Sequence, residues 1–287
     1  MKKYLGIASL LLMGGCFNTN SPAVSGDNPF LSTFNEVIEQ VVTDLTQTQE
    51  GKVIDMKDLV GLEIPFMAGD KDVYEHMGYT VSYNSEYRIP NWVAYELQDS
   101  ELYGDLDRAE KFTPDPLIKG RQAYDSDYVG SGYDRGHLAP AGDMKWSSQA
   151  MQESFYLSNV CPQNHNLNAG VWNDLEKQVR KEARYYGKVW VVCGPIVDKN
   201  RYGKIGENKV QVPDWFFKAL LAKNKDGEYI SVAFVFPNEA GDNGLSSYAM
   251  SVNQLEKIIG MDLFYNLDNN IQEKVEETYD LWAWRIR

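Results

Sequence analysis

Positive charge is scarce in this chain of 287 residues, which has 28 Lys and Arg against 41 Asp and Glu and a formal net charge of −13. An acidic surface usually argues against a nucleic-acid or anionic-membrane partner. Repeats and low-complexity stretches are missing as well, and 18 Tyr, 11 Phe and 7 Trp argue against disorder over most of the length. The length and a hydrophobic content of 43% are enough for one large globular domain with a sizeable core.

A long apolar run is absent from the N-terminus, where the stretch from Tyr4 to Met13 is too short to span a bilayer as a permanent helix. Two lysines precede this stretch, and Gly14-Gly15-Cys16 follows it and resembles a bacterial lipoprotein cleavage box. We therefore expect residues 1–15 to be a signal peptide and Cys16 to carry a lipid that anchors the protein to a membrane. The expected location is the bacterial cell envelope, at its periplasmic or outer surface, or outside the cell. The alternative is an ordinary secretory signal with an incidental cysteine.

Cysteine is also rare, and only Cys161 and Cys193 remain after Cys16. An envelope location would permit a disulfide between them. Two buried free thiols fit the sequence equally well, because the required geometry cannot be read from spacing.

The domain plan follows from composition and periodicity. Residues 16–28 are small, polar and turn-rich and are expected to form a tether. Residues 29–50 are expected to be an amphipathic helical segment, since apolar residues recur there at helical spacing. The remaining residues, 51–287, are expected to form one compact domain.

Within that domain the pattern predicts an α+β fold with a mostly antiparallel central sheet flanked by helices. A hairpin is expected over 79–97 with its turn near Pro90, followed by a loop over 98–132 and a short buried strand over 155–161. A helix is expected from Asn168 to a stop at Gly187, with Val171, Trp172, Leu175 and Val179 facing inward. Further expected elements are a strand over 189–197, two strands within 215–237 joined at Asp226-Gly227, and a helix over 251–260 with Ile258 and Ile259 on its inner side.

Histidine is the third scarce residue type, with only His76, His137 and His165 in the chain. His137 lies in the stretch YDRGHLAPAGDMKWS, residues 133–147. A neutral imidazole can take a proton from water, and Arg135 can bind phosphate oxygens with its guanidinium fork. If this stretch is a strand, Arg135 and His137 lie on the same face, and Asp134 lies on the opposite one. The alternative is a hydrogen-bonded structural histidine.

A second stretch, SNVCPQNHNLNAGVWNDLE, supplies Asn159, Asn168 and Glu176. Amide oxygens bind hard cations such as Mg²⁺ and leave most of the positive charge of the ion in place. Glu176 follows Asn168 by eight residues, a little over two helical turns, so it leans to roughly the same side of a helix. Each residue also has a structural alternative: a helix N-cap for Asn168, a solvated helix face for Glu176, and a loop brace for Asn159.

In this order, DRGHLAP and then FYLSNVCPQNHNLNAGVWNDLE resemble the DNA/RNA non-specific endonuclease family, which includes the Serratia nuclease, cyanobacterial nuclease A and mitochondrial endonuclease G. The segments PNWVAYEL, RAEKFTPD and VVCGPI are similar to family segments too, and the resemblance covers about residues 60–285. It implies a ββα-metal (His-Me finger) active site. Cys161 within the second stretch and AGDMKW after Pro140 depart from some members.

The resemblance implies a role for each candidate residue. His137 would be the general base, and Asn168 the single protein ligand of Mg²⁺, which Mn²⁺ could replace. Glu176 would hold a water on that ion, Arg135 and Arg108 would neutralise the phosphate, and Asn159 would position His137 or the substrate. The implied reaction is hydrolysis of DNA and RNA phosphodiesters, without sugar or base preference, to 5′-phosphate ends.

An acidic protein can hold a polyanion if its basic residues are gathered in one place. Residues 177–188 contain five basic residues against one Glu, and Lys119, Arg121, Arg135 and Lys145 lie near the DRGH motif in the sequence. A basic groove is therefore expected, with an ordinary solvated helix face as the alternative. Two rival functions are a hydrolase of small phosphodiesters or nucleotides, and a non-catalytic envelope lipoprotein that docks a partner through residues 29–47.

Overall fold

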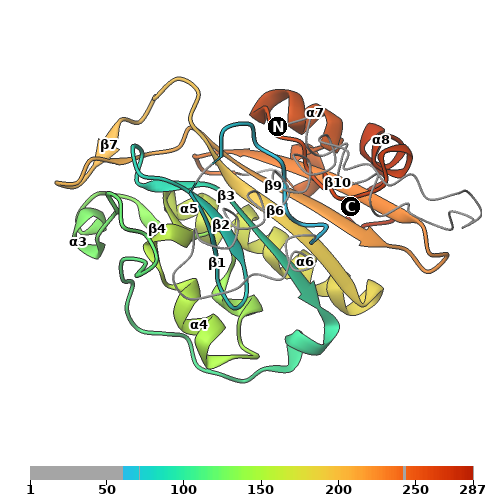
Figure 1. The fold of residues 1–287 in the computed structure, drawn as a ribbon, viewed down its shortest axis with the longest axis horizontal. Coiled ribbons are helices and arrows are strands. Elements are labelled where there is room, and N and C mark those ends of the chain that lie inside the picture. Colours follow the sequence, from blue (N-terminus) through green and yellow to red (C-terminus); the bar gives the residue numbers. More distant parts are fainter. Residues whose placement is uncertain (1–60, 71, 242–243, 287) are drawn as a thin grey trace, which may run out of the picture. The chain divides into compact units, whose positions relative to one another are not determined.

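The computed structural model describes residues 61–286, apart from residues 71 and 242–243 (Figure 1). All of these belong to one compact unit, which comprises residues 56–287. The expected signal peptide, tether and amphipathic segment, with Cys16 among them, lie outside the described residues. No helix in the described part of the chain is long and apolar enough to cross a membrane.

The centre of the unit is a seven-stranded sheet in the order β1-β2-β3-β6-β9-β10-β11, and every neighbouring pair is antiparallel. The expected α+β fold with a mostly antiparallel sheet is therefore confirmed. The strands are β1 (Val73–Glu75), β2 (Thr80–Asn84), β3 (Ile89–Gln98), β6 (Lys188–Ile196), β9 (Trp215–Lys223), β10 (Tyr229–Pro237) and β11 (Ala249–Met250).

Smaller elements surround this sheet. Two short sheets pair β4 (Asp134–His137) with β5 (Val160–Gln163), and β7 (Lys204–Ile205) with β8 (Val210–Gln211). The α-helices are α3 (Asp125–Tyr128), α4 (Ser148–Ser154), α5 (His165–Ala169), α6 (Val171–Tyr186), α7 (Val252–Ile259) and α8 (Asn269–Glu277). Four 3-10 turns complete the described part: Asp99–Tyr103, Ala141–Asp143, Leu157–Asn159 and Leu245–Tyr248.

The sheet is covered on both faces, which explains why its central strands are almost continuously apolar. Trp172, Leu175 and Val179 of α6 pack with Phe216 and Leu220 of β9 in one core cluster. On the other face, α7 and α8 cover a second cluster, to which β9 contributes its alternate residues Phe217, Ala219 and Leu221 (Figure 1). Because side chains alternate along a strand, Lys218 of β9 faces α6.

The hairpin near residue 90 differs from the expectation. Its turn lies between β2 and β3 at residues 85–88, where Arg88 has a φ of 58°, and Pro90 is inside β3. Proline lacks the N–H that a regular ladder needs. Pro90 pairs with Tyr83 next to a register shift, and this irregularity lets the strand include it.

The short strand expected over 155–161 is also displaced. Leu157–Asn159 form a 3-10 turn, and the strand is β5, which includes Pro162. Pro162 is tolerated because, in the described part of the chain, β5 pairs with no strand other than β4, so its other edge has no strand partner.

The long helix expected from Asn168 is confirmed in its inward stripe and in its end at Gly187, whose φ is 83°. It is interrupted at Gly170, however, and Asn168 belongs to the preceding helix α5. A Cβ at residue 170 would overlap the carbonyl oxygen of Asn166, so only glycine fits this break.

The strand at 189–197, the strand pair joined near Gly227 and the helix over 251–260 are confirmed. For the helix over 251–260, the predicted inner position of Ile258 is wrong. Val252 and Leu255 are buried, whereas the side chain of Ile258 is 54% exposed. Cys161 and Cys193 are both buried free thiols, which is one of the two alternatives that the sequence left open.

Candidate active site

The site is built on the β4–β5 pair and on the helices that follow it. His137 pairs with Val160, and Arg135 pairs with Pro162. Between them, a Cβ at Gly136 would overlap the side chain of Gln163, so glycine is required for the two strands to approach. Helices α5 and α6 continue directly from β5, which gives the ββα order that the family resemblance implies.

The side chain of His137 is only 6% exposed and lies between two aromatic rings. The ring centroids of Phe112 and Phe155 are 5.2 Å and 4.9 Å from its own. Its Nε2 is buried without a hydrogen-bond partner among the described residues. Burial, and then the positive charge of Arg108, lower the pKa of His137 to about 3. The imidazole is therefore neutral near pH 7.

Asn159 braces the chain just after His137. Its Nδ2 donates to the carbonyl oxygens of Ala139 (2.9 Å) and Ser154 (2.8 Å), and its Oδ1 accepts from the backbone N–H of Ala139 (2.9 Å). Its own carbonyl accepts from the N–H of Leu138. The side chain is fully buried, so it holds the segment after His137 and does not face a substrate.

Two further side chains fix the carbonyl groups of the same segment. Trp172 Nε1 donates to the carbonyl of His137 at 3.3 Å, and Lys218 Nζ donates to that of Leu138 at 3.1 Å. Lys218 is fully buried and lies 4.6 Å from the centroid of the Trp172 ring, in cation–π contact. Lys218 is not among the residues predicted for the site, although a lysine inside the apolar strand WFFKALLA is itself a signal.

Asn168 is tied to β4 through Asp134. Its Nδ2 donates to Asp134 Oδ2 at 2.9 Å, and His165 Nδ1 contacts the same oxygen at 2.9 Å. The side chain of Asn164, not that of Asn168, caps α5. Among the described residues, Asn168 Oδ1 makes no hydrogen bond. An amide oxygen that is oriented and unpaired in this way can serve as a metal ligand.

Glu176 lies half-buried on α6, and its carboxylate has no hydrogen bond among the described residues. Burial raises its pKa to about 7, against the opposing effect of the nearby Lys218 ammonium. The charge of Asp143 raises the pKa further, and those of Arg180 and Arg108 lower it. Glu176 and His137 therefore share one electrostatic neighbour, Arg108.

One turn further along α6, Arg180 points toward the same region. Its Nη1 lies 2.6 Å from Oδ1 of Asp143. The Asp143 carboxylate is buried, and its Oδ2 accepts a hydrogen bond from the hydroxyl of Tyr95 at 3.1 Å. From the sequence, Arg180 is expected only as one of the basic residues in 177–188. Its place four residues after Glu176, on the same side of a helix, is the signal that could have identified it.

The two candidate phosphate-binding arginines flank the aromatic rings around His137. The guanidinium carbon of Arg108 is 5.2 Å from the centroid of the Phe155 ring, and that of Arg135 is 5.7 Å from the centroid of the Phe112 ring. Arg135 is held by Asp125, with its Nε 2.5 Å from the carboxylate. The structure thus gathers His137, Arg108, Arg135 and Glu176, and connects Asn168 to them through Asp134 in β4.

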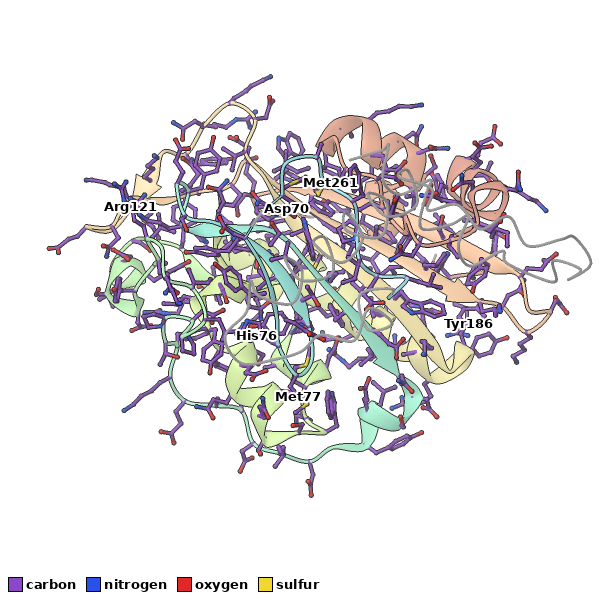
Figure 2. The ribbon with its side chains drawn as sticks, viewed as in Figure 1. Asp70, His76, Met77, Arg121, Tyr186 and Met261 are labelled. Carbon is purple, nitrogen blue, oxygen red and sulfur yellow. The ribbon has the colours of Figure 1, made fainter. Side chains whose placement is uncertain are left out.

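The expected basic groove is not one continuous patch. Arg180 pairs with Asp143, Lys188 with Glu96 at 2.8 Å and Lys177 with Asp174 at 3.0 Å, while Arg184 lies over the ring of Tyr103. Figure 2 places Arg121 at the outer edge of the molecule, across the view from Tyr186 at the end of α6. The cations therefore form separate groups.

Comparison with known proteins identifies the family. The family model for DNA/RNA non-specific endonucleases matches residues 63–270. The chain is 40% identical to the human mitochondrial nuclease EXOG over 209 residues. This alignment covers 67% of this chain and 57% of EXOG. It is 38% identical over 196 residues to human mitochondrial endonuclease G, covering 64% of this chain and 66% of that protein. The chain thus spans less than two thirds of the length of either relative.

A solved structure shares the fold. The crystal structure of the EndoG/EndoGI complex contains a chain that superposes with a TM-score of 0.68 and 27% sequence identity. The superposition covers 80% of this chain and 97% of that one.

The same relatives correct the prediction of location. EXOG and endonuclease G are mitochondrial proteins, so the expected bacterial envelope or secreted location is wrong. That expectation rested on the first 16 residues, where positive charge and a short apolar run do not specify one compartment. The lipid on Cys16 depended on the same location and has no support from the described residues.

The matched family model, the relatives and the superposed fold agree with one another and with the ββα arrangement around His137. The expectation of an enzyme of the endonuclease class is confirmed at the level of the family. This chain belongs to the DNA/RNA non-specific endonuclease family, whose members are metal-dependent nucleases.

Proposed function

We propose that this protein is a Mg²⁺-dependent endonuclease that hydrolyses phosphodiester bonds in both DNA and RNA and leaves 5′-phosphate ends. The observation that carries the proposal is the environment of His137. A neutral imidazole, whose buried Nε2 has no partner among the described residues, lies between two aromatic rings, each of which carries an arginine guanidinium within 6 Å. This combines a base with two charges suited to a phosphate.

The residues present fit a divalent cation. Asn168 offers Oδ1, which is unpaired among the described residues and is oriented by Asp134. Glu176 offers a carboxylate without a hydrogen bond among those residues. No group of three or more His, Cys, Asp or Glu in the described part of the chain is arranged to hold a metal. Asn168 would therefore hold the cation, and Glu176 would face the water around it. Mg²⁺, or Mn²⁺ in its place, would supply positive charge beside the phosphate.

In the proposed reaction His137 removes a proton from a water molecule, and the water oxygen attacks phosphorus in line with the departing 3′ oxygen. Arg108 and Arg135 stabilise the extra negative charge of the transition state. Asn159, Trp172 and Lys218 contribute indirectly, because they fix the backbone that holds His137. The bond between phosphorus and the 3′ oxygen breaks, the 3′ oxygen takes a proton from solvent and becomes a hydroxyl, and the phosphate stays on the 5′ oxygen of the downstream fragment.

The proposed contacts also account for substrate breadth. Arg108, Arg135 and a bound cation would all interact with phosphate, which is the same in DNA and RNA and carries no base sequence. Cleavage of both polymers is therefore expected.

A direct test uses the full chain with plasmid DNA and with RNA, in Mg²⁺ and in excess EDTA. We expect both polymers to be degraded only with the metal. The product ends should accept a 5′ label from polynucleotide kinase only after phosphatase treatment. Absence of cleavage by the folded protein in both Mg²⁺ and Mn²⁺, or products that carry free 5′ hydroxyls, would contradict the proposal.

A further inference from the structure

A hollow of about 290 Å³ lies on the exposed side of α6, and we refer to it as the α6 hollow. Its lining includes three basic side chains, Lys177 and Lys181 of α6 and Arg285 near the C-terminus, with Asp174 as its acidic member. The chain as a whole carries a formal net charge of −13, so this group is opposite in sign to the chain's overall charge. A group of this kind complements a small anion.

The contacts of these side chains leave positive charge available. Lys177 pairs with Asp174 at 3.0 Å, and both side chains are more than half exposed. Lys181 makes no ion pair with the described residues. Arg285 Nη2 lies 2.8 Å from Oε2 of Glu182, a buried carboxyl whose pKa is raised to about 7 by burial. Carboxylates therefore neutralise the hollow only in part.

Arg285 is held in place by its surroundings. Its guanidinium carbon lies 3.6 Å from the centroid of the Tyr185 ring, and its Nη2 also donates to the carbonyl of Lys181 at 3.1 Å. The segment around it is fastened to α6 by Gln178, which donates to the carbonyl of Trp284 at 3.0 Å. A cation fixed before binding loses little conformational entropy when an anion arrives.

The α6 hollow is separate from the active site but lies on the same helix. Glu176 and Arg180 lie on the side of α6 that faces Asp143. Lys177 directly follows Glu176 and Lys181 directly follows Arg180, so both lysines lie about 100° further around the helix. A helix with its side chains is about 10–12 Å across. A nucleic-acid strand that lies beside Glu176 and Arg180 would therefore reach the hollow by crossing the exposed face of α6.

We propose that the α6 hollow binds a backbone phosphate of the polynucleotide substrate, outside the phosphodiester that is cleaved. The inference rests on the proposed function and extends it, because it makes the preferred substrate a strand long enough to occupy both places. The recognising groups are Lys177, Lys181 and Arg285, and Asp174 opposes them. Removing a cation should therefore weaken binding, and removing the carboxylate should strengthen it.

The test compares four variants: Lys181→Gln, the double variant Lys177→Gln/Lys181→Gln, Asp174→Asn, and the control Lys257→Gln. Lys257 is an exposed lysine of α7, on the opposite face of the sheet. The dissociation constant of a labelled 20-nucleotide single strand is measured in EDTA at several salt concentrations, so that no cleavage occurs. KM and kcat are then measured in Mg²⁺ for the same strand and for a dinucleotide.

We expect the double variant to bind the strand roughly tenfold more weakly than the unmodified protein. The plot of log affinity against log salt concentration should become shallower, with its negative slope reduced in magnitude by about 0.7 for each lost phosphate contact. Asp174→Asn should bind more tightly, and Lys257→Gln should be unchanged. The double variant should raise KM for the long strand and leave the dinucleotide unaffected.

Equal affinities and slopes for the double variant and the control would overturn the proposal, as would an equal loss on the dinucleotide. Failure of the proposed function is a different result, in which the unmodified protein cleaves neither substrate. The binding series in EDTA would still report on the hollow in that case.

Discussion

Asn168 Nδ2 donates a hydrogen bond of 2.9 Å to Asp134 Oδ2, which joins α5 to the strand that carries His137. The bond sets the orientation of the amide, because only Nδ2 can donate. Oδ1 is thereby turned away from Asp134. The single side chain proposed to bind the cation is thus positioned by the residue three places before the proposed base.

Replacement of Asp134 by Asn should weaken metal binding more than catalysis. The amide of Asn168 would lose its charged acceptor and could rotate, and loss of a partner that orients a ligand typically reduces metal affinity about 10–100-fold. We expect the Mg²⁺ concentration for half-maximal activity to rise by that factor, with most activity regained at high Mg²⁺. Asp226→Asn, at an exposed position of the turn between β9 and β10, is the matched control. An unchanged Mg²⁺ midpoint in Asp134→Asn would show that the hydrogen bond has no such role.

Asn159→Ala should reduce stability. The side chain makes three hydrogen bonds to buried backbone groups of Ala139 and Ser154, and each group left unsatisfied costs about 1–3 kcal/mol. We expect the free energy of unfolding in urea to fall by about 3 kcal/mol or more. Asn166→Ala, at an exposed position of α5, should change it by less than about 0.5 kcal/mol. Similar values for the two variants would mean that Asn159 is not the brace described above.

The pH dependence of kcat and that of the apparent Mg²⁺ affinity should distinguish the role of His137 from that of Glu176. A pKa of about 3 leaves His137 neutral from about pH 4 upward, so kcat at saturating Mg²⁺ should not fall between pH 8 and pH 5. Glu176, with its pKa raised to about 7, becomes protonated below that pH in the metal-free protein. The apparent Mg²⁺ affinity should therefore decline as the pH falls below 7, and this decline should be absent in Glu176→Gln. A kcat at saturating Mg²⁺ that titrates near pH 6.5 would place an ordinary histidine at the site.

Glu276 should make the protein less stable in alkaline solution. Its side chain is 3% exposed, its Oε1 has no partner among the described residues, and burial raises its pKa to about 9. A carboxyl whose pKa is raised by folding contributes stability below its unfolded pKa and loses it as the pH rises toward the folded value. The change that Glu276→Gln makes in the free energy of unfolding should therefore be about 2–4 kcal/mol more favourable at pH 9 than at pH 5.

The control for this substitution is Glu273→Gln, an exposed position on the same helix. Urea unfolding at both pH values measures the difference. If Glu276→Gln changes stability equally at pH 5 and pH 9, then Glu276 is already ionised in the folded protein.

The sequence predicted those parts of the site that depend on local pattern. Alternation along a strand placed Arg135 and His137 together, and helical spacing identified Val171, Trp172, Leu175 and Val179 as the inward face of α6. The order of DRGH and the asparagine-rich stretch was enough to recognise the family, because the chemistry resides in a short ββα unit. These features require contacts between residues that are close in the sequence.

Features that depend on long-range packing were missed. Lys218 comes from β9 and reaches the carbonyl of Leu138, 80 residues earlier in the chain. Asp143, which holds Arg180, was not singled out because nothing local distinguishes a buried carboxylate from a surface one. The turn at Pro90 was misplaced because a register shift between β2 and β3 accommodates the proline, and such a shift is set by pairing rather than by propensity.

The most direct test of the account is the turnover number of His137→Ala on plasmid DNA at saturating Mg²⁺, measured together with its Mg²⁺ midpoint and its unfolding in urea. General-base catalysis typically contributes 10²–10⁴-fold, so we expect kcat to fall by at least about 100-fold. The Mg²⁺ midpoint and the folded state should be retained. A folded variant that keeps kcat within about tenfold of the unmodified protein would contradict the assignment of His137 as the base.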